Sequence, residues 1–294
     1  MPPPDALRSW CFFVIASVAA TAVTYWGIGG LVHWWFYVHR RADAATWKLQ
    51  PSRFLGPRLT RQAFLLGSGN ILMGSVIGGT FAWYVARGGR TALYFDVDRH
   101  GVAYLPMSAV LLYFAIDAGL YYSHRLFHHR ALFRHVHRWH HRFVTPMIFT
   151  TTAVHPVEFL TFELFLILPA LVIPAHVGVY IAVIAYTYLI GMIDHSGARM
   201  AWKLPLHASN RFHDDHHVYF HCNYGHHTAL FDRLHGTVRR PDRHYDAATF
   251  GGKGRAVTAT AAAITATATT EITTAIGREH DARTEPQGAR AGGS

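Results

Sequence analysis

Three groups of histidines at helical spacing place the strongest constraint on how this chain folds. Of its 23 histidines, 18 lie between residues 124 and 235. The groups are His124 with His128; His137 with His140 and His141; and His213 with His216 and His217. Residues three and four apart share one face of a helix, so each group can direct two or three imidazoles at one point. Imidazole is the commonest protein ligand for metals, and these eight residues suit two ions better than one.

The overall composition indicates a membrane protein. The chain is 51% hydrophobic and only 15% charged, against about 25% charged residues in a typical soluble protein. The net charge is +10, but the basic residues cluster beside apolar runs and no nucleic-acid motif is present. This balance favours an anionic membrane surface or an acidic protein partner over nucleic acid. Two cysteines exclude a disulfide framework, and Cys222 is expected to pack rather than to bind metal.

Four apolar runs cover residues 10–38, 62–86, 102–123 and 157–193. The first has 29 residues, more than the roughly 20 that cross a bilayer, and is predicted to remain as an anchor. The last holds two prolines near its middle and is predicted to form a hairpin of two segments. The sequence therefore predicts an all-α, polytopic membrane protein with about four to five membrane segments and a helical, histidine-rich cap for two metals.

The loop charges predict which side of the membrane carries the histidines. Six basic residues lie between residues 40 and 61, whereas residues 87–99 hold three arginines and two aspartates. The positive-inside rule then places the first loop, and with it all three histidine groups, in the cytoplasm. We assign residues 1–250 to one membrane-embedded catalytic domain. Residues 251–294 are rich in Ala, Thr, Gly and Arg and lack aromatics, so we expect a low-complexity, mostly disordered tail.

Three further residues are candidates for the metal site. Asp117 lies inside an apolar run on the same helical face as His124, and an acid there is functional by default. We expect its carboxylate to orient His124 or a neighbouring ligand. His155 and His195 stand at the two ends of the hairpin, which would bring both beside the groups, and both are expected as ligands. Four other histidines stay open as ligands: His207, His221, His226 and His227.

The donor set favours iron over other metal chemistries. The chain has no HExxH motif, so a zinc metalloprotease would lack its general base. It also lacks the carboxylate-rich pattern of four-helix di-iron proteins. Ligation of two ions by histidine alone fits a membrane di-iron oxygenase. The alternatives are a His-rich metal transporter, although no internal repeat is present, and a zinc-dependent membrane hydrolase, which needs a general base.

About half of the chain, residues 92–238, resembles the fatty acid hydroxylase/sterol desaturase superfamily. Its pattern is HxxxH, then HxxHH, then a later HxxHH on the cytosolic side of a few spans. The matching segments are residues 117–129, 135–158, 194–197, 212–225 and 228–237. Within the superfamily, LYFDVDRHG and FDRLHGT look most like C-5 sterol desaturases, while DHSG also resembles sphingoid-base and methylsterol hydroxylases.

This resemblance implies a lipid substrate, of sterol, fatty acyl or sphingoid type, that enters from the bilayer. It implies two irons that activate dioxygen and abstract hydrogen from a C–H bond, giving an alcohol by hydroxyl rebound or an alkene by loss of a second hydrogen. The ligand set then combines the eight grouped histidines with His155 and His195. Because no HPGG segment is present, electrons from NAD(P)H are expected through a separate cytochrome b5-like or ferredoxin-like protein. The oligomeric state stays open.

Overall fold

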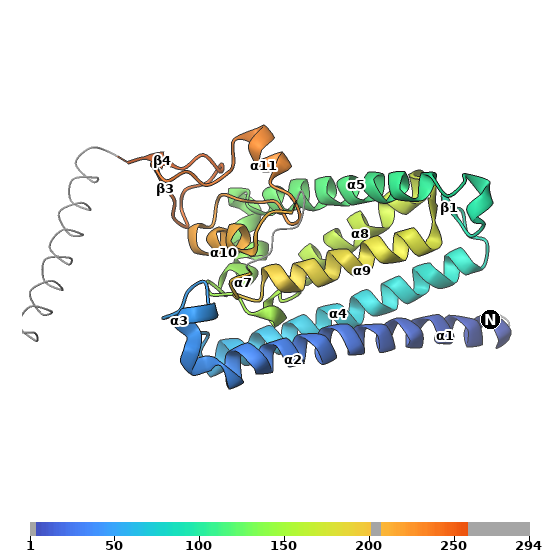
Figure 1. Cartoon of the computed structure of the whole chain (residues 1–294), viewed down its shortest axis with the longest axis horizontal. Coiled ribbons are helices and arrows are strands. Elements are labelled where there is room, and N and C mark those ends of the chain that lie inside the picture. Colours follow the sequence, from blue (N-terminus) through green and yellow to red (C-terminus); the bar gives the residue numbers. More distant parts are fainter. Residues whose placement is uncertain (1–3, 201–206, 258–294) are drawn as a thin grey trace, which may run out of the picture. The chain divides into compact units, whose positions relative to one another are not determined.

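The computed structural model describes residues 4–200 and 207–257. One compact unit comprises the described residues up to Arg239 together with Tyr245–Gly254. Within it, long helices run side by side, and shorter helices gather at one end (Figure 1). A second unit contains a small antiparallel pair, β3 (Arg243–His244) with β4 (Arg255–Ala256).

The N-terminal apolar run forms one continuous helical segment. It begins as α1 (Pro4–Thr21), passes through the π-helical η1 (Ala22–Ile28), and continues as α2 (Gly29–His33) and the π-helical η2 (Trp34–His39). Its outer side chains are apolar and exposed, with Phe12 and Ile15 each 67% exposed. Such a surface is suited to contact with lipid rather than water.

The second long helix, α4 (Pro57–Ala86), packs along α1 (Figure 1). Gly79 permits this close approach, because a Cβ there would lie 2.6 Å from the Val14 Cα. The two helices also exchange side-chain hydrogen bonds, from Trp10 Nε1 to Thr80 Oγ1 at 3.0 Å and from Ser75 Oγ to Thr21 Oγ1 at 2.7 Å. Small residues and interhelical hydrogen bonds are the usual means of joining helices inside a bilayer.

Three more helices complete the bundle. They are α5 (Tyr104–Phe127), α8 (Pro156–Val172) and α9 (Val177–Asp194), and α5 packs against both of the others. The turn between α8 and α9 contains β2 (Ala175–His176), which pairs in parallel with β1 (Leu93–Tyr94). The predicted hairpin is therefore present as two helices. The buried core between them includes Leu112, Ile116, Leu120, Leu166 and Val183.

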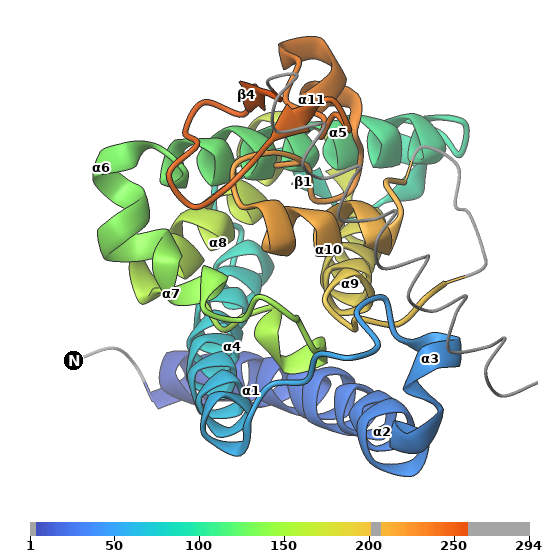
Figure 2. The ribbon, with the colours of Figure 1, turned by 90° about the vertical axis from the view of Figure 1, so that its left-hand side faces the viewer.

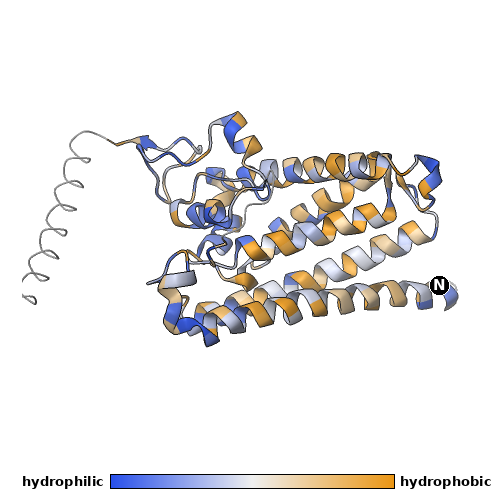
Figure 3. Ribbon diagram, in the orientation of Figure 1, coloured by the Kyte–Doolittle hydropathy of each residue, from blue (hydrophilic) through white to orange (hydrophobic). Residues whose placement is uncertain are grey.

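Within residues 4–200 and 207–257, four helices are long and apolar enough to cross a membrane: Asp5–His39, Pro57–Ala86, Tyr104–Phe127 and Val177–Asp194. The helix α8 is apolar but has only 17 residues. Figure 3 shows hydrophobic residues along the long helices and hydrophilic residues concentrated at the end that carries α7 and α10. The prediction of an all-α, polytopic membrane protein with four to five segments is confirmed.

Most of the short helices lie at this hydrophilic end, which faces the viewer in Figure 2, whereas η4 (Val97–Arg99) follows β1 at the opposite end. Three carry most of the grouped histidines: η5 (Phe133–His137), α7 (Arg138–His141) and α10 (Asn210–Tyr219). The other short helices of the chain are η3 (Arg41–Asp43), α3 (Ala44–Trp47), η4 (Val97–Arg99), α6 (Arg130–Leu132), η6 (Ile148–Thr150) and α11 (Leu230–His235). The end of the first helix holds this region in place, because the Tyr37 hydroxyl donates to the carbonyls of Pro146 at 2.9 Å and Ser196 at 2.8 Å. Most of the predicted tail, residues 258–294, lies outside the described residues, so its disorder and the domain division stay predictions.

Gly79→Ala is expected to destabilise the protein by about 1–3 kcal/mol, because the new methyl group overlaps the α1 backbone. The matched control is Gly78→Ala, where the nearest atom, Ser17 Oγ, lies 3.7 Å from the new Cβ. Thermal unfolding in detergent measures both variants. An equal or higher unfolding temperature for Gly79→Ala would contradict the close packing of α1 on α4.

Candidate metal centre

In the described part of the chain, nine histidines form two buried clusters, and in each cluster one ligand atom per residue lies within 4.8 Å of the others. The first cluster, called cluster A, comprises His124, His128, His137, His141 and His216. The second, cluster B, comprises His140, His195, His213 and His217. The structure thus brings together all eight grouped histidines and adds His195.

Two helical segments contribute to both clusters and so fix their adjacency. In α7, His140 belongs to cluster B and its neighbour His141 to cluster A, with ring centroids 5.9 Å apart. In α10, His216 belongs to cluster A and His217 to cluster B, with ring centroids 5.7 Å apart. Consecutive residues on a helix diverge by about 100°, so one helix can serve two neighbouring sites. The remaining clustered histidines are His124 in the last turn of α5, His128 directly after α5, His137 at the end of η5, and His195 directly after α9.

The clustered histidines are almost completely removed from solvent, and none is more than 4% exposed. Burial lowers the pKa of His128, His137 and His141 well below the usual range, and the neighbouring imidazoles lower it further. In cluster B, burial lowers the pKa of His195 to about 4. The imidazoles are therefore neutral at physiological pH and keep a nitrogen lone pair for a metal.

The arrangement of their nitrogens fits metal ions. Nε2 atoms face one another at 2.9 Å between His213 and His195 and at 3.1 Å between His124 and His137. One inward-facing nitrogen of cluster A has no partner: His216 Nε2 makes no hydrogen bond among the described residues, while its Nδ1 contacts the Cys222 carbonyl. Buried polar atoms without partners are costly. A metal ion bound by cluster A would satisfy this nitrogen, and imidazole suits iron, zinc, copper and nickel.

Outer hydrogen bonds orient several of these rings. Four of the histidines use Nδ1 to contact an acceptor outside the clusters, which leaves Nε2 directed inward. The pairs are His137 with Glu158 Oε1 at 2.5 Å, His124 with Tyr224 O at 2.7 Å, His216 with Cys222 O at 2.7 Å, and His195 with Gly191 O at 2.8 Å. Such contacts fix the ring rotation and raise the basicity of the ligand nitrogen.

Asp117 does not contact His124 as predicted. Its carboxylate accepts hydrogen bonds from the backbone N–H of His227 at 3.1 Å and of Thr228 at 3.3 Å, and from Thr228 Oγ1 at 2.6 Å. It therefore secures the loop that follows Tyr224, whose carbonyl accepts from His124. The correction is that Asp117 acts on the cluster through this loop rather than through the imidazole.

His155 belongs to neither cluster. It stands directly before Pro156 at the start of α8, where its Nδ1 accepts from the Val157 N–H at 3.2 Å. Its ring packs against Trp139 with centroids 4.7 Å apart. A side chain that caps its own helix in this way is turned back on α8, so the expectation that the hairpin would bring His155 to the clusters was wrong.

Glu158 was not predicted from the sequence, although it lies in the HPVE segment that begins with His155. It is 1% exposed and contacts His137 of cluster A. The sequence offered a signal for it, because an acid within an apolar run is the same feature that singled out Asp117.

Two of the open histidines lie against cluster A. His221 Nδ1 lies 3.0 Å from His128 Nδ1, and the ring centroid of His226 lies 4.7 Å from that of His124. The other two have different neighbours: His207 Nε2 lies 3.3 Å from Asp194 Oδ1, and His227 stacks on Tyr113.

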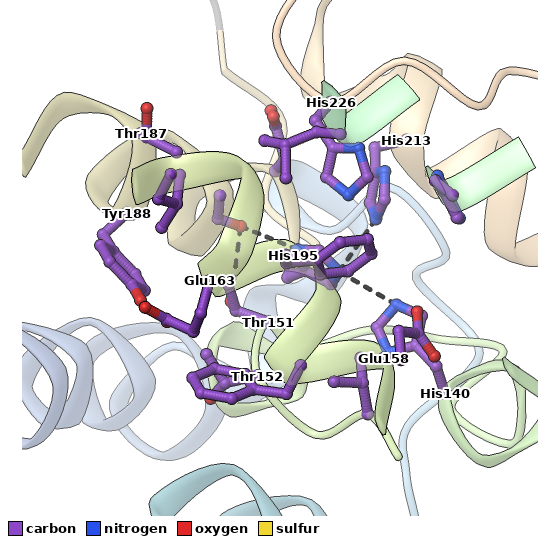
Figure 4. Close-up of a pocket in the computed structure, with 18 of the residues that line it drawn as sticks. His140, Thr151, Thr152, Glu158, Glu163, Thr187, Tyr188, His195, His213 and His226 are labelled. Atoms are coloured by element: carbon purple, nitrogen blue, oxygen red, sulfur yellow. Dashed lines mark hydrogen bonds between the residues drawn. The ribbon is translucent and has the colours of Figure 1, made fainter. Parts of the chain in front are cut away.

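One cavity adjoins the clusters, and a second shares part of its lining. The first, a small one of about 80 Å³, is lined by histidines of both clusters, together with Glu163 and Tyr188 (Figure 4). A larger, mostly apolar cavity of about 570 Å³ lies among α1, α4, α8 and α9. Both are lined by Thr151, Thr152, Glu163, Leu166 and Tyr188, so they meet at these residues. A molecule held in the apolar cavity can therefore present one end to the clusters.

The segment that carries the clusters is similar to known lipid-modifying proteins. Residues 109–237 match the sequence model of the fatty acid hydroxylase family. The chain is 31% identical over 166 residues to a Delta(7)-sterol 5(6)-desaturase of Candida glabrata, which covers 55% of this chain and 45% of the relative. It is 33% identical over 167 residues to that of Saccharomyces cerevisiae, with the same coverage of 55% and 45%. It is also 33% identical over 171 residues to lathosterol oxidase of Rattus norvegicus, covering 56% of this chain and 55% of the relative.

The chain thus spans about half the length of the curated relatives that it matches. No solved structure matches it.

Single substitutions are expected to separate the two clusters. His128→Ala should empty cluster A and His140→Ala cluster B, so that each variant retains about one metal per chain where the parent binds about two. The control is His135→Ala, which removes an exposed neighbour that belongs to neither cluster. Elemental analysis of gently purified protein gives the count. Two metals retained in both variants would contradict the assignment.

Glu158→Gln is expected to weaken metal retention about 10- to 100-fold, because the neutral amide holds the His137 ring less firmly than the carboxylate. The control on the same helix is Thr161→Ala, whose hydroxyl donates only to the Val157 carbonyl. Titration with a competing chelator measures retention in both. Equal retention in Glu158→Gln and the parent would show that this contact does not tune the site.

Proposed function

We propose that this chain is a membrane-bound, di-iron, dioxygen-dependent hydroxylase or desaturase of a lipid. The match of residues 109–237, which carry the histidine clusters, to the fatty acid hydroxylase model supports this proposal. The single observation that carries the proposal is the pair of adjacent, all-histidine clusters at the end of an apolar cavity. The similarity to sterol desaturases favours a sterol-type lipid.

Iron is the proposed metal because the two clusters together offer nine neutral imidazoles, and the clusters contain no thiolate or carboxylate ligand among the described residues. The Cys222 thiol belongs to neither cluster; only its carbonyl contacts a clustered histidine. When bound, the two irons would supply dioxygen activation and the abstraction of hydrogen from a C–H bond. The relatives' names support this redox chemistry over hydrolysis.

The protein's own part is to bind, orient and exclude water. The apolar cavity holds the hydrocarbon body, while the small cavity admits only the part of the lipid that reacts. Ile181 and Leu189 of α9 line the apolar cavity and are 60% and 36% exposed. This wall supports entry of the lipid sideways from the bilayer. The neutral histidines and the Glu158 contact keep the ligand geometry fixed while the lipid binds.

A basic surface supports a separate electron donor. Four exposed arginines recur at intervals of four residues along the segment whose inner face carries three clustered histidines: Arg130, Arg134, Arg138 and Arg142. We propose that an acidic cytochrome b5-like or ferredoxin-like protein docks here and delivers electrons from NAD(P)H, with an association rate that falls with salt. The positive-inside rule supports a cytoplasmic position for this face.

The alternatives are less well supported. A transporter binds its cargo near the middle of the bilayer on broken helices, whereas both clusters lie where the long helices end. A zinc hydrolase needs a free general base beside the metal, and Glu158, which lines the histidine cavity, is already bonded to His137.

Expression in a host with defined lipids under labelled dioxygen tests the proposal by lipid mass spectrometry. A new labelled alcohol would indicate hydroxylation, and a new unlabelled double bond would indicate desaturation. His140→Ala is expected to insert into the membrane normally but to give neither product, because cluster B loses a ligand. Product formation without iron or without dioxygen would refute the proposed function.

A further inference from the structure

A buried carboxylate–phenol pair lies where the two cavities meet. Glu163 of α8 accepts a hydrogen bond from the Tyr188 hydroxyl of α9, and both side chains line both cavities. Figure 4 shows the two side chains pointing toward each other on one side of the pocket, with His195, His213 and His140 on the other. Any lipid that reaches the clusters from the apolar cavity passes this pair.

The helices leave space for the Glu163 carboxylate. Glu163 is 6% exposed, and Tyr188 is its only hydrogen-bond partner among the described residues. A Cβ at Gly74 of α4 would lie 2.9 Å from Glu163 Oε1, so the helix has no side chain where the carboxylate sits. An ionisable group in an apolar bundle is costly and marks a functional site by default.

The other polar side chains at the junction are already occupied. Thr151 Oγ1 donates to the Ile148 carbonyl at 2.7 Å, and Thr152 Oγ1 donates to the Gly67 carbonyl at 3.2 Å. Thr187 differs, because its Oγ1 is buried without a partner among the described residues and the side chain lines the histidine cavity. Glu163, Tyr188 and Thr187 are therefore the groups that can take a polar atom of a ligand.

The two volumes determine how a lipid must lie. The apolar cavity, at about 570 Å³, falls within the range of roughly 300–1,000 Å³ that holds small-molecule ligands. The histidine cavity, at about 80 Å³, has room for only a few atoms. The bulk of the lipid therefore stays in the apolar cavity, and only one end or edge reaches the clusters. The polar pair stands beside that end.

We propose that Glu163, together with Tyr188, binds a hydroxyl group of the lipid substrate. A sterol-type alcohol then enters with its hydroxyl end first and is oxidised within a few bonds of that hydroxyl. The lipid hydroxyl donates to the Glu163 carboxylate, and its oxygen accepts from the Tyr188 hydroxyl. These are positioning residues, and the inference rests on the proposed function for what happens at the metals. An acyl chain oxidised far from its polar end would not use this pair.

Equilibrium binding to the purified full-length protein in detergent tests this without any turnover. The probes are cholesterol, cholestene, which has the same skeleton without the hydroxyl, and cholesteryl methyl ether, which cannot donate. The parent protein is expected to bind cholesterol about tenfold more tightly than either analogue, as a hydrogen bond to a carboxylate implies. Glu163→Gln and Tyr188→Phe should each reduce this ratio to about twofold or less.

The matched control is Tyr186→Phe, which removes a hydroxyl from α9 at a position that lines neither cavity, and it should keep the parent ratio. If Glu163→Gln does not elute as a folded protein in size-exclusion chromatography, the binding measurements on Tyr188→Phe still test the site. Equal binding of the three probes by the parent would overturn the hydroxyl site. An unchanged preference of Glu163→Gln for cholesterol over the two analogues would also overturn it. If turnover were lost in that variant, the carboxylate would act in proton delivery and not in binding the hydroxyl. A protein that shows the ratio but oxidises no lipid would support the hydroxyl site and contradict the proposed function.

Discussion

Nine neutral imidazoles face one another at the buried end of an apolar helix bundle, and much of the remaining structure keeps them there. Without metal, His216 Nε2 has no hydrogen-bond partner among the described residues, which costs free energy. Backbone carbonyls and Glu158 fix the rings from outside, and Asp117 secures the loop that supplies one of those carbonyls. Bound metal ions would be partners for the inward-facing ring nitrogens of the clusters. Metal binding and the folding of this end of the protein are therefore expected to be coupled.

The bundle connects these clusters to the bilayer. Helices α8 and α9 each carry polar side chains at one end and apolar side chains along the rest, so one hairpin forms both the floor of the histidine cavity and a wall of the apolar cavity. The close packing of α1 on α4 closes the opposite wall. A lipid can thus stay in an apolar environment until only its reacting end is exposed to the metals, which keeps water away from the reaction.

The sequence predicted the elements better than the contacts between them. Helical spacing and apolar length depend on local periodicity, so the helices, the hairpin and the eight grouped histidines could be identified. Which cluster each histidine joins was not predictable, because His140 and His141 are neighbours that serve different clusters. The partner of Asp117 lies 110 residues away in the chain. The prediction of His155 as a ligand was wrong, because the side chain caps its own helix, and this local hydrogen bond competes with a distant metal site.

X-ray absorption at the iron edge of the purified, iron-loaded protein shows whether the two histidine clusters hold a pair of irons. We expect nitrogen and oxygen neighbours only, with no sulfur contribution, and a second iron at roughly 4 Å as in other two-metal sites. A single isolated iron per chain, or sulfur ligation by the buried Cys222, would contradict this expectation.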